Sequence, residues 1–250
     1  MLRLALIGTG NLGIHLATAC SKQPQIQLVQ WIGRTTQAPK HPNNIPYFTE
    51  VQKNIAADLC IIAVQDDQIG AVAEQLIDID SCIVHTSGAA HLNMLRDCKR
   101  SGVLYPLQSF VKDQAVDWTN IPICIEANNA TDLATLEQCA RALSTKVFKL
   151  SSQERATAHL AAVFANNFTN HMVHIGQALC AQEKLPTKLL DELLKTTFER
   201  ATNSLAENKQ TGPAKRNDVA TMEQHLKQLD QTKKNIYNAI SKDIYNTHNV

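Results

Sequence analysis

LRLALIGTGNLG, residues 2–13, is the stretch of this 250-residue chain that decides its fold. An apolar run with the length of a buried strand is followed directly by three glycines, and residues 11–21 continue with helical spacing. In a strand–turn–helix unit, the first glycine makes a tight turn, the second lets the backbone approach a pyrophosphate, and the third lets helix and strand pack closely. The alternative is a turn that only connects two packed elements. We therefore expect a dinucleotide-binding turn at Gly8, Thr9, Gly10, Asn11, Leu12 and Gly13.

Composition indicates an ordinary globular protein, with 44% hydrophobic and 19% charged residues and a net charge of +1. A nearly neutral chain sets up no strong field, so we expect no nucleic-acid or membrane partner. Seven scattered cysteines form no C-x-x-C pair, and no apolar run is long enough to span a bilayer. With no signal-peptide pattern either, we expect a cytoplasmic protein. His171 and His174 lack a completing ligand set, so we expect no metal.

The pattern of the chain changes at Ser151. Before it, apolar runs alternate with helical stretches, which predicts a Rossmann-type, doubly wound, mostly parallel sheet over residues 1–150. After it, only helical patterns remain, which predicts an all-helical domain over residues 151–250. The strands we expect are Leu2–Ile7, Ile26–Ile32, Leu59–Val64, Cys82–His85, Val103–Tyr105, Ile121–Glu126 and Lys146–Leu150; the helices before Ser151 include Asn11–Ser21, Ile69–Leu76 and Thr131–Leu143, and residues 35–46 are expected to form a loop.

Three helices are expected in the second part of the chain. A capping box at Ser151 and Glu154 predicts the start of a helix of about thirty residues, apolar on more than one face. Such a helix rarely fits a monomer of this size, which favours a homodimer formed through the helical domain. A second helix is expected to start near Pro186, and a third to run from Val219 to Ile244.

The end of the second predicted strand indicates the cofactor. It is followed by Gly33, Arg34 and Thr35, where an NAD-binding turn would carry a carboxylate. A carboxylate would repel a 2′-phosphate, whereas Arg34 is suited to bind one, so we favour NADP(H) over NAD(H). The alternative for Arg34 is a solvated surface arginine. Val64 and Gln65, at the end of the third expected strand, are expected to form a wall of the cofactor site.

Three further segments carry candidate chemistry. Ser87, with Thr86 and Gly88, follows a predicted strand at the sheet edge where ligands bind, and is suited to hold a substrate; helix-capping hydroxyls are the alternative. On the long helix, His159 and Asn166 are spaced to lie near one face, which suggests a general acid with Asn166 or Asn167 orienting the substrate. A structurally bonded histidine is the alternative there. The last candidate is Arg216, in a Gly-Pro turn, as a partner for an anionic substrate group or as part of a solvated loop.

These motifs together resemble a known bacterial family, which joins a Rossmann-like half to a domain of unknown function numbered 2520. The motifs are Gly8-x-Gly10-Asn11-x-Gly13, Ala63-Val64-Gln65-Asp66, His85-Thr86-Ser87-Gly88, Tyr105-Pro106-Leu107-Gln108-Ser109-Phe110 and Thr211-Gly212-Pro213-Ala214-x-Arg216-x-Asp218. Members are described as NADP oxidoreductases. The chain is more distantly similar to pyrroline-5-carboxylate reductase, the deazaflavin-dependent NADP reductases and the β-hydroxyacid dehydrogenases, and this resemblance implies a Rossmann domain followed by a helical dimerisation domain.

One position departs from the β-hydroxyacid dehydrogenases, which carry a catalytic lysine three residues before an Asn-Asn pair. The matching residue here is Val163, and the nearest candidate acid is His159. We therefore expect an NADP(H)-dependent oxidoreductase that transfers a hydride to a small carbonyl or imine substrate, with its site between the Rossmann domain and the long helix. The alternative is a non-catalytic NADPH-binding sensor or scaffold protein.

Overall fold

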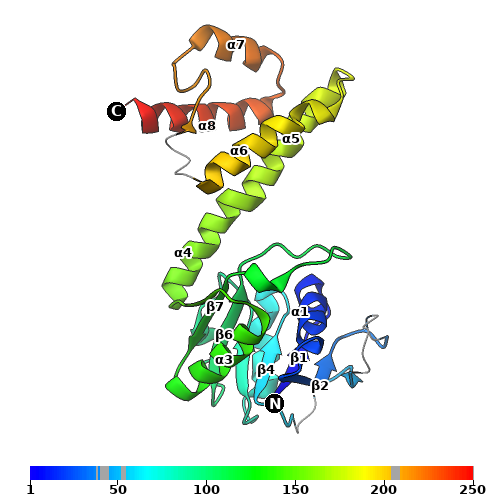
Figure 1. The fold of residues 1–250 in the computed structure, drawn as a ribbon. Helices are drawn as coiled ribbons and strands as arrows, with labels where there is room; N and C mark the ends of the chain where they lie inside the picture. The colour runs from blue at the N-terminus through cyan, green and yellow to red at the C-terminus, as the bar shows by residue number, and fades with distance from the viewer. Residues whose placement is uncertain (38, 40–44, 52–54, 204–208, 250) are drawn as a thin grey trace. The chain divides into compact units, whose positions relative to one another are not determined.

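The structure is a computed structural model that describes residues 1–37, 39, 45–51, 55–203 and 209–249. The chain divides into two compact units, Met1–Asn170 and His171–Val250. The first unit carries an eight-stranded sheet, and the described part of the second is helical (Figure 1). The α/β class predicted from the sequence, a Rossmann-like sheet followed by helices, is confirmed.

The order of the strands is β3-β2-β1-β4-β5-β6-β7-β8, with β1 to β6 parallel and β7 antiparallel to β6. Because the chain leaves β1 toward β2 and later returns to β1 with β4, the order reverses between β1 and β4. Ligands of doubly wound sheets bind outside the carboxyl ends of the strands at such a point. The strands are β1 (Leu2–Ile7), β2 (Ile26–Ile32), β3 (Tyr47–Phe48), β4 (Leu59–Ile62), β5 (Cys82–His85), β6 (Ser101–Pro106), β7 (Ile123–Ala127) and β8 (Val147–Lys149).

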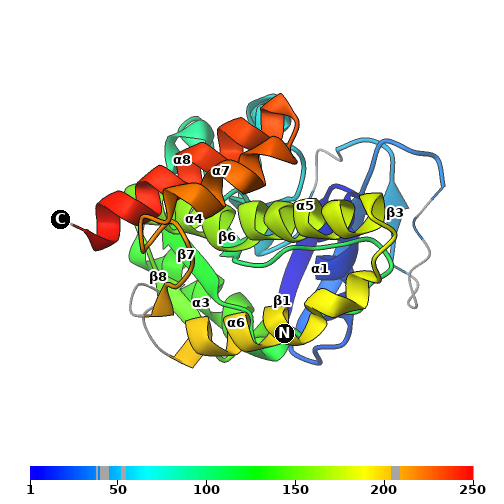
Figure 2. The ribbon, with the colours of Figure 1, turned by 90° about the horizontal axis from the view of Figure 1, so that it is seen from above.

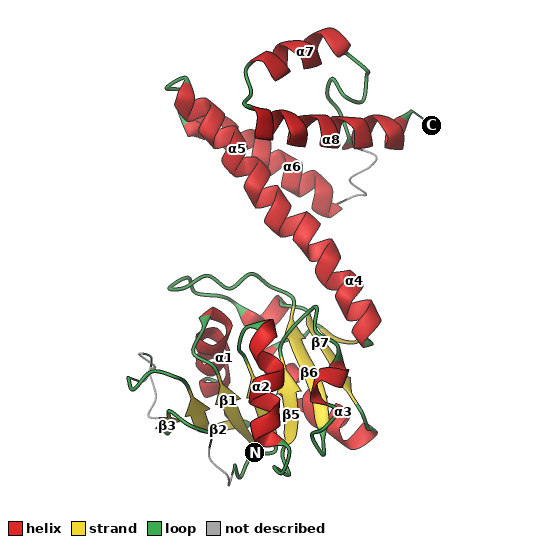
Figure 3. Cartoon of the chain, turned by 180° about the vertical axis from the view of Figure 1, so that it is seen from behind, coloured by secondary structure: helices red, strands yellow, loops and turns green. Residues whose placement is uncertain are grey.

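Helices cover both faces of the sheet because alternate side chains of each strand point to opposite faces. Leu4 and Leu6 share one core with α1 (Asn11–Ser21) and α3 (Ala130–Leu143). Ala5 and Ile7 belong to the other core, with α2 (Ile69–Ala73) and the short helical turn Leu92–Leu95. Figure 3 shows α1, α2 and α3 around the strands.

The long helix starts where the sequence predicted. Ser151 and Glu154 form the capping box, and the helix runs from α4 (Ser152–Ala162) into α5 (Thr169–Gln182). Between them lies a π-helical turn, Val163–Phe168, which the sequence pattern did not predict. A π turn adds residues to each turn and so changes the angular spacing of side chains. The spacing that placed His159 and Asn166 on one face therefore does not apply across it.

The second unit contains three more helices in the described residues. A helical turn at Thr187–Leu190 leads into α6 (Asp191–Asn203), close to the predicted start at Pro186. From the end of α5 the chain turns back, and α6 runs at an angle to α5 (Figures 1 and 2). The single helix expected over residues 219–244 is wrong: α7 (Val219–Lys227) and α8 (Gln231–His248) are separate. Asp230 caps the Lys233 amide at 2.9 Å, which starts a new helix there.

Several boundaries agree with the sequence to the residue, namely β1, β2, β5 and α1. The sequence did not predict β3, which pairs with β2 through Trp31 and Tyr47. A strand of two residues is too short to show an alternating pattern, and the expected loop over residues 35–46 lies partly outside the described residues.

Candidate functional site

The glycine turn separates into two structural glycines and one open position. Gly8 has φ of +120°, and a Cβ there would lie 2.1 Å from the Ala63 carbonyl oxygen. A Cβ on Gly13 would lie 2.4 Å from the Gly8 carbonyl oxygen, so both positions exclude side chains for steric reasons. Around Gly10, no described atom lies within 4 Å of where a Cβ would be. Among the described residues, the space next to Gly10 is thus open.

The start of α1 is suited to an anion. Gly10 caps the helix without a side-chain hydrogen bond, and the first turn contains no acidic residue. The amide groups of a helix start are unsatisfied donors and carry a partial positive charge. The indole N–H of the buried Trp31 donates to the Gly8 carbonyl at 2.8 Å and so stabilises the turn. The sequence analysis missed this contact.

Beside this turn, β3 holds the segment that would meet the adenosine end of a dinucleotide. The Tyr47 hydroxyl donates to the Thr35 carbonyl at 2.9 Å, and a Cβ on Gly33 would lie 2.3 Å from that hydroxyl oxygen. The Thr35 hydroxyl donates to the Gln37 carbonyl at 3.0 Å, and Arg34 is exposed. Tyr47 therefore fixes the backbone on either side of Arg34, although its own strand was not predicted.

The hydroxyls after β5 are engaged within the protein. Ser87 donates to the Asp66 carboxylate at 2.7 Å and accepts from the Ala89 and Ala90 amides. Thr86 is buried and donates to the Ile62 carbonyl at 3.2 Å. These contacts favour a structural role for both hydroxyls, because Ser87 closes the turn after β5 and Thr86 bonds to the neighbouring strand β4. At the neighbouring end of β4, Val64 is half-buried and Gln65 is exposed. Because β4 and β5 are parallel, with Ile62 opposite His85, their carboxyl ends lie at the same edge of the sheet.

A tyrosine and a histidine meet at the same edge. The Tyr105 hydroxyl at the end of β6 lies 3.0 Å from His159 Nδ1 on α4, and the rings are nearly perpendicular. A Cβ on Gly88 would lie 2.6 Å from the Tyr105 ring and 2.7 Å from His159 Nδ1. Gly88 is therefore buried beneath this pair. The contact joins two of the predicted site residues, Gly88 and His159, with Tyr105, which the sequence analysis named only within a motif.

Burial shifts the pKa values of two residues of this site, Tyr105 and His85. Desolvation, with the nearby Cys124 and Asp66, raises the pKa of Tyr105 to about 12, so its hydroxyl keeps its proton at neutral pH. Desolvation, with the Arg155 charge, lowers the pKa of His85 to about 3, so this imidazole is neutral. His85 Nδ1 accepts from the Ser87 amide at 3.2 Å. His85 thus supports the turn.

The start of the long helix is held to the sheet by a buried ion pair. Arg155 is 1% exposed, pairs with Glu126 of β7, and donates to the Ala90 carbonyl at 2.6 Å. Ser152 donates to the same carboxylate at 2.8 Å and accepts from the Leu92 amide at 3.0 Å. Because α4 is attached here, His159, one turn further, is placed against Tyr105. No sequence pattern pairs residues from these distant segments.

The asparagines and Arg216 are placed differently from the histidine. Asn166 and Asn167 lie in the π turn and are exposed, beside Phe164 and Phe168, which are 62% and 48% exposed. Both asparagines are therefore open to solvent in the single chain. Arg216 is exposed in the second unit, where Asp218 caps α7.

The part of the chain that the structure describes contains no disulfide and no cluster of metal ligands. All seven cysteines are free, and burial raises the pKa of Cys60, Cys82 and Cys139 to about 12. Over residues 1–37, 39, 45–51, 55–203 and 209–249, no group of three potential ligands is placed to hold a metal ion. No helix within the same residues is long and apolar enough to cross a bilayer.

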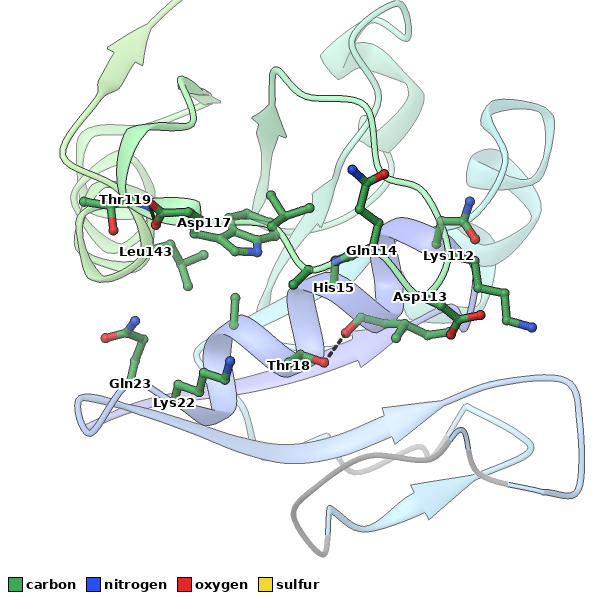
Figure 4. Close-up of a pocket in the computed structure, with 16 residues that line it drawn as sticks. His15, Thr18, Lys22, Gln23, Lys112, Asp113, Gln114, Asp117, Thr119 and Leu143 are labelled. Atoms are coloured by element: carbon green, nitrogen blue, oxygen red, sulfur yellow. Dashed lines mark hydrogen bonds between the residues drawn. The ribbon is translucent and has the colours of Figure 1, made fainter. Parts of the chain in front are cut away.

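A separate cavity of about 420 Å³ lies between α1 and the segment that follows β6 (Figure 4). His15 holds this segment through the Val111 carbonyl at 2.9 Å, and Trp118 packs beneath it. Neither Tyr105 nor His159 lines this cavity, so it is distinct from the strand-end site.

Comparison with known proteins agrees with this architecture. Residues 121–244 match the family model described as "Domain of unknown function (DUF2520)". A crystal structure from Bacteroides fragilis, described as a "putative NADP oxidoreductase", is 32% identical, with 98% of each chain covered and a TM-score of 0.87. No curated protein matches the chain.

More distant structures share the fold. A reductive aminase from Aspergillus terreus in complex with NADPH and ethyl levulinate is 16% identical, with 100% of this chain and 96% of that one covered and a TM-score of 0.69. A Plasmodium falciparum pyrroline carboxylate reductase with NADP bound is 12% identical, with 99% and 98% covered and a TM-score of 0.63. The resemblance drawn from the motifs is confirmed, and the chain belongs to the DUF2520 family.

Proposed function

We propose that this protein is an NADP(H)-dependent oxidoreductase that transfers a hydride to the carbonyl or imine carbon of a small substrate. The observation that carries the proposal is the open position at Gly10, between two glycines that the fold requires, at the uncapped start of α1. Backbone amides there are available to a pyrophosphate. The similar protein from Bacteroides fragilis, described as an NADP oxidoreductase, supports the same activity.

NADP(H) is favoured over NAD(H) at the end of β2. Arg34 is exposed next to a backbone fixed by Tyr47, and no carboxylate follows the strand to repel a 2′-phosphate. Calorimetry with NADPH and NADH tests this preference. Arg34→Ala should weaken NADPH binding about tenfold, the value of one charge-assisted hydrogen bond, and leave NADH binding unchanged. Equal loss for both cofactors would argue against the assignment.

The proposed reaction places a proton donor beside the acceptor carbon. When bound, NADPH supplies the hydride, and the glycine turn with Thr9, Asn11, Leu12, Gly33, Thr35, Val64 and Gln65 holds it. The protonated His159 imidazole gives a proton to the substrate oxygen or nitrogen and becomes neutral. Asn166 or Asn167 orients the substrate, and Thr86, Ser87 and Gly88 shape the strand-end wall. Arg216 is proposed to pair with a substrate carboxylate.

The test compares binding with turnover. Wild type should oxidise NADPH with at least one member of a panel of small ketones, keto acids and imines. His159→Ala and Asn166→Ala should bind NADPH normally and lose that turnover, by about 100-fold for the histidine. His225→Ala is a matched control, because this histidine of α7 also bonds a tyrosine, Tyr237, and has no proposed role in the reaction; it should leave both binding and turnover unchanged.

A non-catalytic NADPH sensor is the second candidate. Two observations favour it: Val163 stands where the β-hydroxyacid dehydrogenases carry lysine, and the Thr86 and Ser87 hydroxyls are bonded within the protein. Normal NADPH binding without oxidation by any compound of the panel would favour the sensor over the enzyme.

The helical half, residues 151–250, is proposed to form a homodimer. Large apolar side chains of the long helix and α6 are exposed on the single chain, with Phe164 62% and Leu193 64% exposed. Exposed apolar surface of this kind marks interfaces between proteins. Sedimentation should give twice the mass of one chain, and Phe164→Glu should lower it to one. A monomeric wild type would contradict this assembly.

A further inference from the structure

Tyr105 and His159 form a hydrogen-bonded pair whose parts come from different elements. Tyr105 ends β6 and His159 lies on α4, and their hydroxyl oxygen and Nδ1 are 3.0 Å apart. The ring centroids are 5.9 Å apart, with an interplanar angle of 72°. Gly88 leaves just enough room beneath both rings, since a Cβ there would overlap each of them. The pair is therefore set by the packing around Gly88 and cannot rearrange freely.

The hydrogen bond to the Tyr105 phenol determines which ring nitrogen of His159 is left without a partner. Tyr105 stays protonated at neutral pH, and its O–H has no acceptor besides His159 Nδ1 among the residues that the structure describes. Donation to Nδ1 of a neutral imidazole satisfies this O–H and requires the ring proton to be on Nε2. When the imidazole is protonated, Nδ1–H donates to the phenol oxygen instead. In either state Nδ1 is occupied, and Nε2 has no hydrogen-bond partner among the residues that the structure describes.

Neighbouring polar groups do not compete for the ring. The Ser87 hydroxyl donates to Asp66, and the two terminal nitrogens of Arg155 are directed at Glu126 and the Ala90 carbonyl. Tyr105 is thus the side chain that fixes the state of the imidazole.

We propose that Tyr105 is a positioning residue for His159. It binds Nδ1 of the imidazole and leaves Nε2 as the nitrogen that faces the substrate. The role toward a substrate rests on the proposed function, whereas the placement of the proton does not. A hydroxyl is suited to this task because it donates to the neutral ring and accepts from the charged ring, so the ring keeps its orientation through a proton transfer.

The direct test is the ¹⁵N spectrum of the ring nitrogens in histidine-labelled protein at alkaline pH, where imidazoles are neutral. A His159→Gln spectrum assigns the signal among the nine histidines. We expect the proton of wild-type His159 almost entirely on Nε2, and a mixture of both tautomers in Tyr105→Phe. A proton on Nδ1 in the wild type, or identical shifts in the two proteins, would overturn the proposal. The wild-type result does not depend on any variant folding correctly.

A matched control exists in the second unit. Tyr237 OH lies 2.9 Å from His225 Nδ1, with the rings 5.8 Å apart and nearly perpendicular. Tyr237→Phe removes the same type of hydrogen bond and should leave the His159 signal unchanged.

Activity supplies the second arm. With a substrate that the panel identifies, Tyr105→Phe should lower kcat about tenfold, the value of one hydrogen bond, and leave NADPH affinity as it is; Tyr237→Phe should lower neither. An unchanged kcat in Tyr105→Phe would refute the positioning role. If no substrate is found but the tautomer shifts as expected, the proposed function fails and the proton placement stands.

Discussion

Gly8→Ala and Gly10→Ala should separate the stability of the glycine turn from its binding of NADPH. At Gly8, a φ of +120° and a Cβ 2.1 Å from a carbonyl oxygen both oppose alanine. A strained backbone conformation alone costs about 1–3 kcal/mol, and the overlap adds to it, so we expect a loss of about 3 kcal/mol or more of unfolding free energy. This corresponds to a fall in Tm of roughly 6–12 °C for a chain of this length.

Alanine at Gly10 should act on binding instead. Its φ of −71° suits any residue, and in the described residues no atom outside the adjoining backbone lies within 4 Å of the added Cβ. The loss of glycine at a helix N-cap costs about 0.5–1 kcal/mol, whereas the reduced freedom of the unfolded chain contributes about 0.4–1 kcal/mol in the opposite direction. Stability should therefore change by less than about 1 kcal/mol. The methyl group would occupy the place of a phosphate oxygen and remove about two charge-assisted hydrogen bonds, which weakens NADPH binding about 100-fold.

Urea unfolding measures the first effect and calorimetric titration the second. The two variants differ only in the position of one methyl group, so each serves as the control of the other. The reasoning is refuted if Gly10→Ala binds NADPH as tightly as wild type, or if Gly8→Ala is as stable as wild type.

Two other predictions concern the support of the site. Glu126→Gln leaves the charge of the buried Arg155 guanidinium unpaired and should lower the free energy of unfolding in urea by about 3 kcal/mol or more. The control, Arg141→Gln, breaks a more exposed pair with Glu137 and should lower it by at most about 0.5 kcal/mol. Similar losses in the two variants would contradict the role of burial. Burial lowers the pKa of His85 from 6.5 to about 3, so between these two pH values the unfolded chain binds more protons than the folded chain. The contribution of His85 to the free energy of unfolding is therefore full above pH 6.5 and falls as the pH is lowered. Between about pH 6.5 and about pH 5 this contribution should fall by about 2 kcal/mol. Unfolding of His85→Gln should lack this part of the pH dependence, and equal slopes would count against it.

Residues 2–21 show how much of the site the sequence predicts. The strand, the turn and the helix were predicted to the residue, because glycine sterics and apolar periodicity act over a few neighbours in the chain. The same local reasoning correctly located the capping box at Ser151. It failed at β3, which is too short to have a pattern, and at Asp230, where a capping side chain divided one apolar stripe into two helices.

The amino-acid sequence by itself therefore determined the α/β class, the family and the position of the open glycine, since each depends on short-range pattern. Only the tertiary structure decided that Tyr105 meets His159 over Gly88, because these residues lie on separate elements that strand order and helix docking bring into contact. The same holds for Glu126 and Arg155, whose pairing attaches the long helix to the sheet. A hydrogen bond between distant segments leaves no periodicity in the chain, and its partners become visible only when the packed elements fix both ends.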